Sequence, residues 1–358
     1  MLEVFFAAGK PLEYGERLHQ PALASTLELL ASEGAHAFYN GPLGASWLEC
    51  VRAAGSSLRA DDLKSYSAEV TEPLRASHDG EEIVTAPPNS QGAALLMTLR
   101  MLSDHDGLLD PLSASATILA KIFAATAEAR ARYLADPRYA EVPLSEFVTA
   151  KLPTSPGPSS QAYGRGDTVA VVTADGEGRA VSLIQSLFDS FGVGILDPRT
   201  GIIAHNRGAF FSLDPASPNV LAPGKRPAHT LTPVMSFEGG NLHSVLGTMG
   251  GLAQTQILTH VLLHLRRGMT LTDALTAPRW TVGGIEVGSS RAPIQAEGRV
   301  PRQALEALAA DGWQIVRLPD FAFDAGETQA ITRGRNGCYS AASDPRSEGL
   351  ALVDVASG

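Results

Sequence analysis

The chain has 358 residues, of which 44% are hydrophobic and 18% charged, and this composition is typical of a folded globular protein. Its formal net charge of -10 argues against a nucleic-acid partner, because binding a polyanion requires clustered basic residues. Cys50 and Cys338 lack the spacing of a metal site or a disulfide framework, so at most one pair is open to them. No apolar run reaches the roughly 18 to 20 residues that span a bilayer, and the start lacks the pattern of an export signal. We therefore expect a cytoplasmic protein without a membrane partner.

The first half of the chain is predicted to be mainly helical. Residues 21–34 carry Leu23, Leu27 and Leu30 at helical spacing, and residues 113–137 show a second apolar face. We expect both helices to act as packing layers.

Residues 81–102 read as a short strand, a Pro-Pro-Asn-Ser turn and a helix that begins near Gly92. Residues 151–167 are rich in Pro, Ser and Gly and are the most linker-like part of the chain. A boundary is expected there.

Strand patterns dominate after this boundary. Apolar runs around glycine-containing turns favour antiparallel pairing and predict strands in four stretches, at 168–188, 200–206, 233–247 and 328–343. Residues 252–268 predict a helix that ends at Gly268.

Two histidines of this helix, His260 and His264, are four residues apart and would share one face, which is the geometry of two zinc ligands. Val261 stands where a zinc protease motif has glutamate. We therefore interpret them as histidines of the helix surface or of an interface, and we predict no metal and no other cofactor.

Thr168 heads an apolar strand directly after the linker-like segment. One interpretation is a strand-edge hydroxyl, which is common. The other is an amino-terminal nucleophile: if the bond between Asp167 and Thr168 is cut, the new α-amine, with a pKa near 8, can act as base for the hydroxyl. Amide groups at the Gly250-Gly251 helix entrance could then hold an oxyanion.

The chain resembles the γ-glutamyltranspeptidase family of amino-terminal-nucleophile hydrolases over essentially its whole length. The resemblance is carried in one order by stretches that include "PPNSQG", "GDTVAVV", "AVSLIQSLFDSFGVGI", "HNRGAFFSLDP", "RPAHTLTP", "GTMGG" and "SAASDPRS". Several of these look most similar to the branch that includes oxamate amidohydrolase.

This resemblance implies roles for individual residues. Thr168 falls on the nucleophile, Ser186 on a hydroxyl that supports it, and Gly250 and Gly251 on the oxyanion-hole pair. Asp167 and Thr168 would flank the cleavage site.

The resemblance also implies substrate-binding residues. Asn206 matches an asparagine lining the acyl pocket, and His229 and Thr230 stand where the glutathione-cleaving branch has two serines. Phe210 takes the place of the aspartate that holds the glutamyl amine in that branch, so a γ-glutamyl ammonium would go unpaired. Arg207 offers a fork suited to a carboxylate, which favours a small acid amide such as oxamate, or it pairs with an acid on a structural face.

The fold implied is α+β, a four-layer αββα sandwich of two facing antiparallel sheets between helical layers. Residues 1–167 would form the large-subunit portion and residues 168–358 the small-subunit portion of one structural unit. The family has a further stretch of roughly 150 to 200 residues, enough for a domain, before the part that matches here, so we expect part of the amino-terminal half to be absent.

Three functions stay open: a self-cleaving amide hydrolase or acyltransferase, a γ-glutamyl transferase or hydrolase, and a non-catalytic truncated member. The expected partner is a small-molecule amide, and the processed chains are expected to form a homodimer or heterotetramer.

Overall fold

The computed structural model describes residues 2–7, 9–105, 107–150, 166–283 and 293–353. The chain forms two compact units. The first unit comprises Met1–Val70 and Asp189–Asn206, and the second comprises Thr71–Phe188 and Arg207–Gly358. The predicted division at residue 168 concerns cleavage of the chain rather than its compact units, and it stays a prediction.

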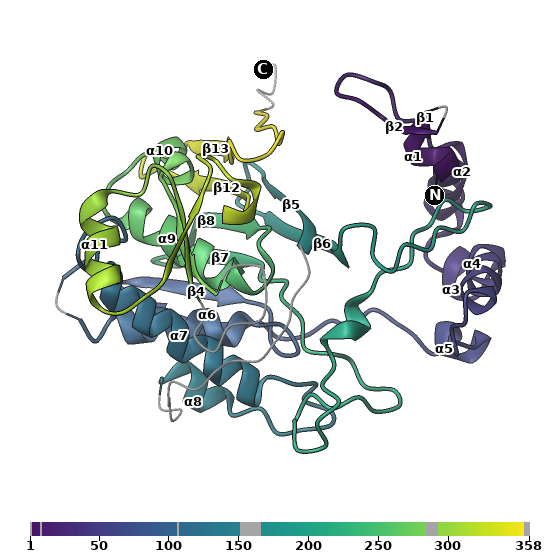
Figure 1. Cartoon of the computed structure of the whole chain (residues 1–358), viewed down its shortest axis with the longest axis horizontal. Coiled ribbons are helices and arrows are strands. Elements are labelled where there is room, and N and C mark those ends of the chain that lie inside the picture. Colours follow the sequence, from purple (N-terminus) through teal and green to yellow (C-terminus); the bar gives the residue numbers. More distant parts are fainter. Residues whose placement is uncertain (1, 8, 106, 151–165, 284–292, 354–358) are drawn as a thin grey trace. The chain divides into compact units, whose positions relative to one another are not determined.

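The first unit is mostly helical (Figure 1). Its elements are α1 (Leu2–Phe5), β1 (Phe6–Ala7), β2 (Lys10–Pro11), α2 (Pro21–Glu33), α3 (His36–Tyr39), α4 (Pro42–Ala53) and α5 (Ala60–Lys64). Both long helices begin with proline, whose fixed φ and missing N–H suit a first turn. The helix predicted at 21–34 is confirmed and ends before Gly34, whose φ is 73°. Its predicted leucine face is only partly buried, since Leu27 is exposed.

The strand predicted at residues 200–206 is wrong. This stretch makes only an isolated bridge, between Leu196 and Ile203. The chain turns tightly at its start, because the Gly201 N–H donates to the Asp197 carbonyl at 2.8 Å and the Thr200 hydroxyl to the Asp197 carboxylate at 2.8 Å. The segment therefore folds back on itself instead of pairing with a neighbouring strand.

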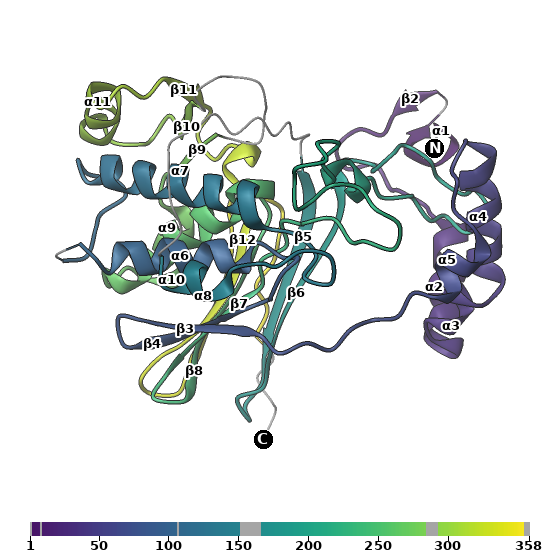
Figure 2. The same cartoon turned by 90° about the horizontal axis from the view of Figure 1, so that it is seen from below.

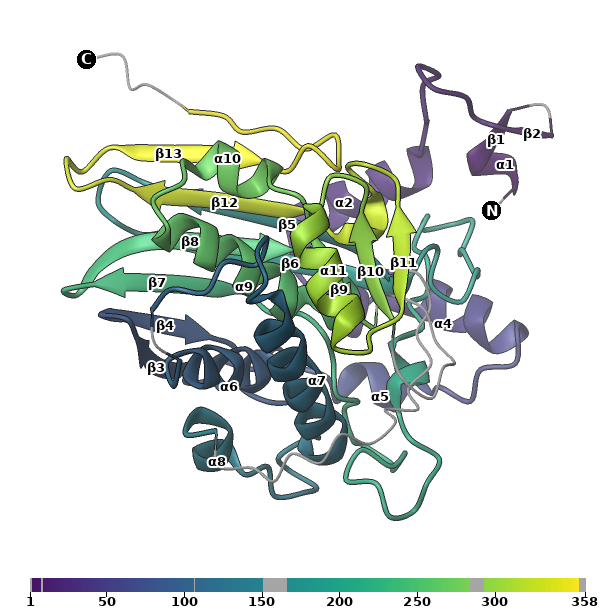
Figure 3. The ribbon, with the colours of Figure 1, turned by 60° about the vertical axis from the view of Figure 1, so that its left-hand side comes forward.

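The second unit is built on a six-stranded sheet with the order β13-β12-β8-β7-β4-β3 (Figure 3). Every neighbouring pair in it is antiparallel. The strands are β3 (Leu74–His78), β4 (Glu81–Thr85), β7 (Val234–Glu238), β8 (Asn241–Thr248), β12 (Thr328–Arg333) and β13 (Tyr339–Ser343). The strands predicted near 81, in 233–247 and in 328–343 are thus confirmed.

Helices cover one face of this sheet (Figure 2). The helices of the unit are α6 (Gly92–Leu102), α7 (Ala116–Tyr133), α8 (Leu144–Val148), α9 (Gln254–Arg266), α10 (Leu271–Thr276) and α11 (Arg302–Ala310). The helices predicted near Gly92, in 113–137 and in 252–268 are confirmed. A small sheet of β9 (Trp280–Val282), β10 (Ile294–Glu297) and β11 (Ile315–Leu318) contains a parallel pair, β10 with β11, that the sequence patterns did not predict.

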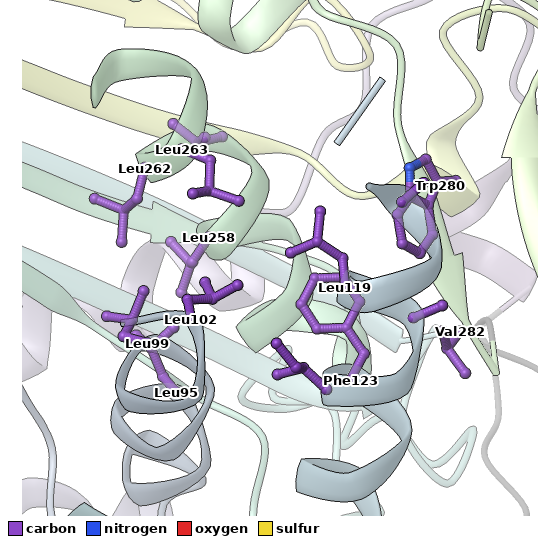
Figure 4. Packing of buried hydrophobic residues seen from close by; sticks show 14 of the residues in the cluster. Leu95, Leu99, Leu102, Leu119, Phe123, Leu258, Leu262, Leu263, Trp280 and Val282 are labelled. Carbon is purple, nitrogen blue, oxygen red and sulfur yellow. The ribbon is translucent and has the colours of Figure 1, made fainter. Parts of the chain in front are cut away.

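The main hydrophobic core lies between the sheet and these helices, and Figure 4 shows its centre. Leu95 and Phe123 come from the chain before Thr168, whereas Leu258 and Trp280 come from the chain after it. The two sides of the predicted cleavage point therefore share one core within this unit.

The hairpin of β5 (Gly166–Ala174) and β6 (Ala180–Asp189) forms a separate two-stranded sheet next to β8 and β12. A Cβ built on Gly247 of β8 would lie 3.0 Å from the Ala170 Cβ and 3.3 Å from the Ser182 Oγ, so this glycine allows the hairpin to approach closely. Alternation along the strands turns Val169 and Leu183 outward, where they are 60% and 53% exposed. The second unit is thus a mixed α+β fold in which helices, a six-stranded sheet and a hairpin lie in succession.

Candidate active site

Thr168 lies near the start of β5 and is 6% exposed. Its Oγ1 is 3.0 Å from the Oγ of Ser186 on the paired strand β6. The hairpin predicted at 168–188 therefore brings the two predicted hydroxyls into direct contact.

Ser186 is also contacted by two N–H groups. The backbone N–H of Phe188 donates to its Oγ at 2.9 Å, and the Nη2 of Arg207 donates to it at 3.1 Å. Arg207 lies in the short helix η1 (Arg207–Phe210), with its guanidinium carbon 4.4 Å from the centroid of the Phe188 ring. Its Nη1 donates to the Thr230 Oγ1 at 3.3 Å. The guanidinium thus joins Ser186 to Thr230.

His229 and Thr230 are held by the "PPNSQG" turn before α6. The His229 N–H donates to the Asn89 carbonyl at 2.9 Å, and the Ser90 hydroxyl donates to the Leu231 carbonyl at 2.6 Å. The imidazole Nδ1 of His229 accepts the Leu231 N–H at 3.2 Å. Burial, with a smaller effect of the Arg207 and Arg226 guanidiniums, lowers the pKa of His229 to about 4. His229 is therefore neutral near pH 7 and offers polarity rather than charge.

Gly250 and Gly251 precede α9, and Gly251 opens the short helix η2 (Gly251–Ala253), which packs against β5. Their φ angles are 141° and 53°, in the region that favours glycine. Backbone N–H groups at such a helix entrance attract negative charge. The structure thus places the predicted oxyanion pair beside the strand of Thr168.

Two further residues of the site, Gln91 and Arg130, are not predicted from the sequence. The Nε2 of Gln91, which is fully buried, donates to the Thr230 carbonyl at 2.7 Å and to the Gly251 carbonyl at 3.1 Å. The Nη1 of Arg130 on α7 donates to the Gln91 Oε1 at 2.9 Å and to the Leu252 carbonyl at 2.9 Å. This pair fixes the segment of Thr230 relative to the glycine turn. The polar residues of "PPNSQG" at the start of a helix are the sequence feature that could have indicated Gln91 as a site residue.

Asn206 and Asp167 were predicted as site residues as well. Asn206 belongs to the first unit, where its Oδ1 accepts the Asp189 N–H at 2.9 Å and its Nδ2 donates to the Asp189 carboxylate. Its role in an acyl pocket stays a prediction. Asp167 lies in β5, and the linker-like residues 151–165 before it lie outside the described residues.

Phe210, which the resemblance aligns with the aspartate of the glutathione-cleaving branch, is 7% exposed. Its ring packs edge-on against Phe188 with centroids 5.4 Å apart, in a cluster with Leu134 and Ala228. The side chain at this position is therefore part of an apolar cluster and supplies no acceptor for an ammonium group.

A cavity of about 370 Å³ runs along β5 and includes Thr168 among its lining residues. Met249, next to the glycine pair, also lines it, as do Glu327 and the segment Gly349–Leu352. The candidate nucleophile therefore borders this cavity, whereas Ser186, Arg207, Thr230, Gly250 and Gly251 are not among its lining residues.

The interpretation of His260 and His264 as surface or interface histidines is wrong. They are 1% and 2% exposed, because α9 lies between the six-stranded sheet and other helices and has no free face. The His260 ring packs against Trp280, with centroids 5.0 Å apart. Within the described residues, no group of three or more His, Cys, Asp or Glu side chains could hold a metal ion. Cys50 and Cys338 are both free.

Comparison with known proteins adds an independent line of observation. A sequence model of the family described as gamma-glutamyltranspeptidase matches residues 1–353. The oxamate amidohydrolase proenzyme of Klebsiella pneumoniae is 34% identical over 98% of this chain and 68% of its own length. The glutathione hydrolase-like YwrD proenzyme of Bacillus subtilis is 33% identical over 98% of this chain and 69% of its own. Among solved structures, a cephalosporin acylase from Bacillus halodurans superposes with a TM-score of 0.84 at 27% identity, covering 98% of this chain and 65% of that one.

Proposed function

Because this chain belongs to the γ-glutamyltranspeptidase family of amino-terminal-nucleophile amidohydrolases, we propose that it is made as a proenzyme whose Thr168 first cuts its own chain and then attacks amide substrates. The predicted family and enzyme class are confirmed, and the relatives carry the word proenzyme in their names. The chain spans about two thirds of the length of these relatives, so its own activity remains a proposal. The observation that carries it is the contact between the Thr168 and Ser186 hydroxyls at the head of β5.

The first step of this proposal is self-cleavage. The Thr168 Oγ1 attacks the carbonyl carbon of Asp167, its proton passes to the amide nitrogen and the peptide C–N bond breaks, which leaves an ester and a free α-amine on Thr168. Water then hydrolyses the ester and gives the Asp167 carboxylate. Once released, the α-amine can accept a proton from the Thr168 hydroxyl in the later attack on substrate, so that reaction requires no histidine as base.

The second step repeats the attack on a substrate amide. The Thr168 oxygen adds to the amide carbon while its proton passes to the α-amine, and the oxyanion accepts hydrogen bonds from the Gly250 and Gly251 N–H groups. The protonated leaving amine departs and an acyl ester on Thr168 remains. Water hydrolyses it, or an amine takes up the acyl group.

The proposed substrate is a small amide that carries a carboxylate, such as oxamate. Arg207 supports this choice because its guanidinium lies one hydroxyl away from Thr168, and Arg is suited to carboxylates. The name of the Klebsiella relative agrees with it. Phe210 disfavours a γ-glutamyl substrate, since an ammonium buried against the apolar cluster would lack a partner.

We further propose that the hairpin of β5 and β6 is part of the second sheet of a four-layer sandwich.

Mass spectrometry of the expressed chain tests this function. We expect two fragments, one ending at Asp167 and one beginning at Thr168, together with release of ammonia from oxamate. Thr168→Ala should remain one chain and lack activity, and Thr168→Ser, which keeps a hydroxyl, should still be cut. Turnover of oxamate by an uncut chain would contradict the proposal, as would cutting of Thr168→Ala at the same bond. The non-catalytic alternative predicts no cutting and no turnover by any of the three proteins.

A further inference from the structure

Two glycine turns are in contact beside the candidate nucleophile. One is the turn of Met249 and Gly250 after β8, and the other is the turn of Gly326 and Glu327 before β12. The Met249 N–H donates to the Glu327 carbonyl at 2.8 Å. Met249 and Glu327 both line the cavity along β5 that Thr168 borders. The second turn is therefore a direct neighbour of the turn that carries the predicted oxyanion pair.

The packing between the two turns depends on the absence of side chains. A Cβ built on Gly250 would lie 3.8 Å from the Gly326 Cα, and a Cβ on Gly326 would lie 2.8 Å from the Met249 carbonyl oxygen. The Cδ1 of Ile257 on α9 packs against both glycines, because these Cβ atoms would come to 2.3 and 2.2 Å from it. In an interior packed this closely, a shift of the Gly326 turn moves Met249 or Ile257, and both contact Gly250.

The side chain of Arg279 holds the Gly326 turn. Arg279 lies directly before β9 and is 1% exposed. Its Nη1 donates to the Gly326 carbonyl at 2.8 Å, and its Nη2 is 2.5 Å from the Asp344 carboxylate. A guanidinium can only donate, so the direction of the hydrogen bond to Gly326 is fixed. Because a buried ion pair is often no more stabilising than packed apolar side chains, stability alone does not account for this arginine.

We propose that Arg279 is a positioning residue for the oxyanion hole: it holds the Gly326 turn, and through this turn it keeps the N–H groups of Gly250 and Gly251 in place. The inference rests on the proposed function and adds a residue that acts through the main chain of two turns. Donors that are fixed before the reaction stabilise an oxyanion without rearrangement. Loss of Arg279 lets both turns shift, so this stabilisation falls.

The variants Arg279→Met and Arg346→Met form a matched pair. Both remove a buried arginine that contacts the Asp344 carboxylate, but Arg279 donates to the Gly326 carbonyl, whereas Arg346 donates to the Ala277 carbonyl. We expect Arg279→Met to slow self-cleavage and to lower kcat on oxamate about 10- to 100-fold, the effect of a small misplacement at a reacting centre, with KM changed less than about twofold. Arg346→Met should keep both rates within about twofold of the wild type.

The rates are compared at a temperature at which circular dichroism shows both variants to be folded. Equal rate losses in the two variants would overturn the proposal, because the loss would then follow from weakened stability. A raised KM with an unchanged kcat for Arg279→Met would also overturn it, since the arginine would then affect substrate binding instead of the oxyanion.

A second pair of variants tests the same turn if Arg279→Met does not fold. Gly326→Ala, at a φ of 82°, places a methyl group against Met249 and Ile257 and should lower kcat on oxamate about 10-fold. Gly268→Ala is the control: its φ is 83°, so the backbone strain is similar, but its Cβ would meet nothing within 4 Å. It should keep the kcat of the wild type. A wild-type kcat for folded Gly326→Ala would overturn the proposal.

Failure of the proposed function gives a different result, namely no cleavage and no turnover by the wild-type chain. The order of the turn is then measured by amide hydrogen exchange of the uncut protein, with mass spectrometry of peptides that cover residues 249–253. Exchange about tenfold faster in Arg279→Met than in Arg346→Met supports the inference. Equal exchange in the two variants overturns it.

Discussion

Gly250 and Gly251 are neighbours in the chain, but the space around them differs. A Cβ on Gly250 would lie 2.3 Å from the Cδ1 of Ile257, a side chain that is fully buried, and the φ of 141° is strained for any other residue. A Cβ on Gly251 would meet nothing within 4 Å, so only its φ of 53° opposes substitution. The first glycine is required by packing and conformation, the second by conformation alone.

We therefore expect Gly250→Ala to lower the free energy of unfolding by about 2–4 kcal/mol, because strain and overpacking add. Gly251→Ala should lower it by about 1 kcal/mol, the usual penalty of a left-handed alanine. Urea unfolding of both variants measures the difference. Equal losses, or a larger loss for Gly251→Ala, would show that the contact with Ile257 does not constrain this turn.

The family resemblance predicts Thr168 and Ser186 as partners, and the hairpin of β5 and β6 brings their hydroxyls into contact. Neither the resemblance nor the sequence patterns predict Gln91 and Arg130. Their partners are largely backbone carbonyls of distant segments. Because every residue type carries a backbone carbonyl, the sequence does not indicate these contacts. Asn206 and the acyl-pocket role remain predictions.

Among the elements, those with a strong period were predicted and those defined by tertiary contacts were not. The helix α9 and the pair β7 with β8 follow from spacing and from a Gly-Gly turn. The stretch 200–206 has a strand-like composition but is bent by the turn at Asp197. The histidines of α9 look polar in sequence, and only the helices packed around them show that they are buried.

A buried network of charges connects β10 with the segment after β13. The Nη2 of Arg346 is 2.6 Å from the Glu297 carboxylate and its Nη1 is 3.0 Å from the Asp344 carboxylate, which also accepts from Arg279. The side chains are at most 1% exposed. This network gives Asp344 and Arg346 of the "DPRS" stretch a structural role.

Arg346→Met should lower the free energy of unfolding by about 3–5 kcal/mol, because it leaves two buried carboxylates short of a partner. The exposed pair of Arg302 with Glu306 provides the control, since Arg302→Met should change stability by less than about 0.5 kcal/mol. Both values come from chemical denaturation at neutral pH. A small effect of Arg346→Met would mean that the carboxylates are protonated or solvated when the arginine is gone.

For the whole molecule, buried histidines predict how stability depends on pH. Burial lowers the pKa of His78 and of His264 to about 4, as for His229, and lowers that of His260 well below its ordinary value. In the unfolded chain these groups take up protons near pH 6.5, whereas the folded protein excludes them. Because the unfolded state then binds more protons, the free energy of unfolding should fall as the pH drops from about 6.5 to 4.

Urea unfolding at several pH values between 7 and 4 checks this slope, and His264→Leu should make it shallower. The corresponding change at an exposed histidine, His36→Leu, should leave the slope as in the wild type. An unchanged slope in His264→Leu would exclude this side chain as a source of the pH dependence.

In the described part of the chain, no helix is both long and apolar enough to cross a membrane, and the cytoplasmic location stays a prediction.

The side-chain amide of Gln91 sets the distance between two segments of the site. One nitrogen holds the Thr230 carbonyl at 2.7 Å and the Gly251 carbonyl at 3.1 Å, and Arg130 keeps that amide from turning. In the proposed reaction the segment of Thr230 contacts the substrate carboxylate, and the segment of Gly251 contacts the scissile carbonyl. The distance between the carboxylate and the amide of a substrate is then set by Gln91, a buried side chain outside the proposed reaction. The chemical groups of a substrate can therefore vary more freely than its length.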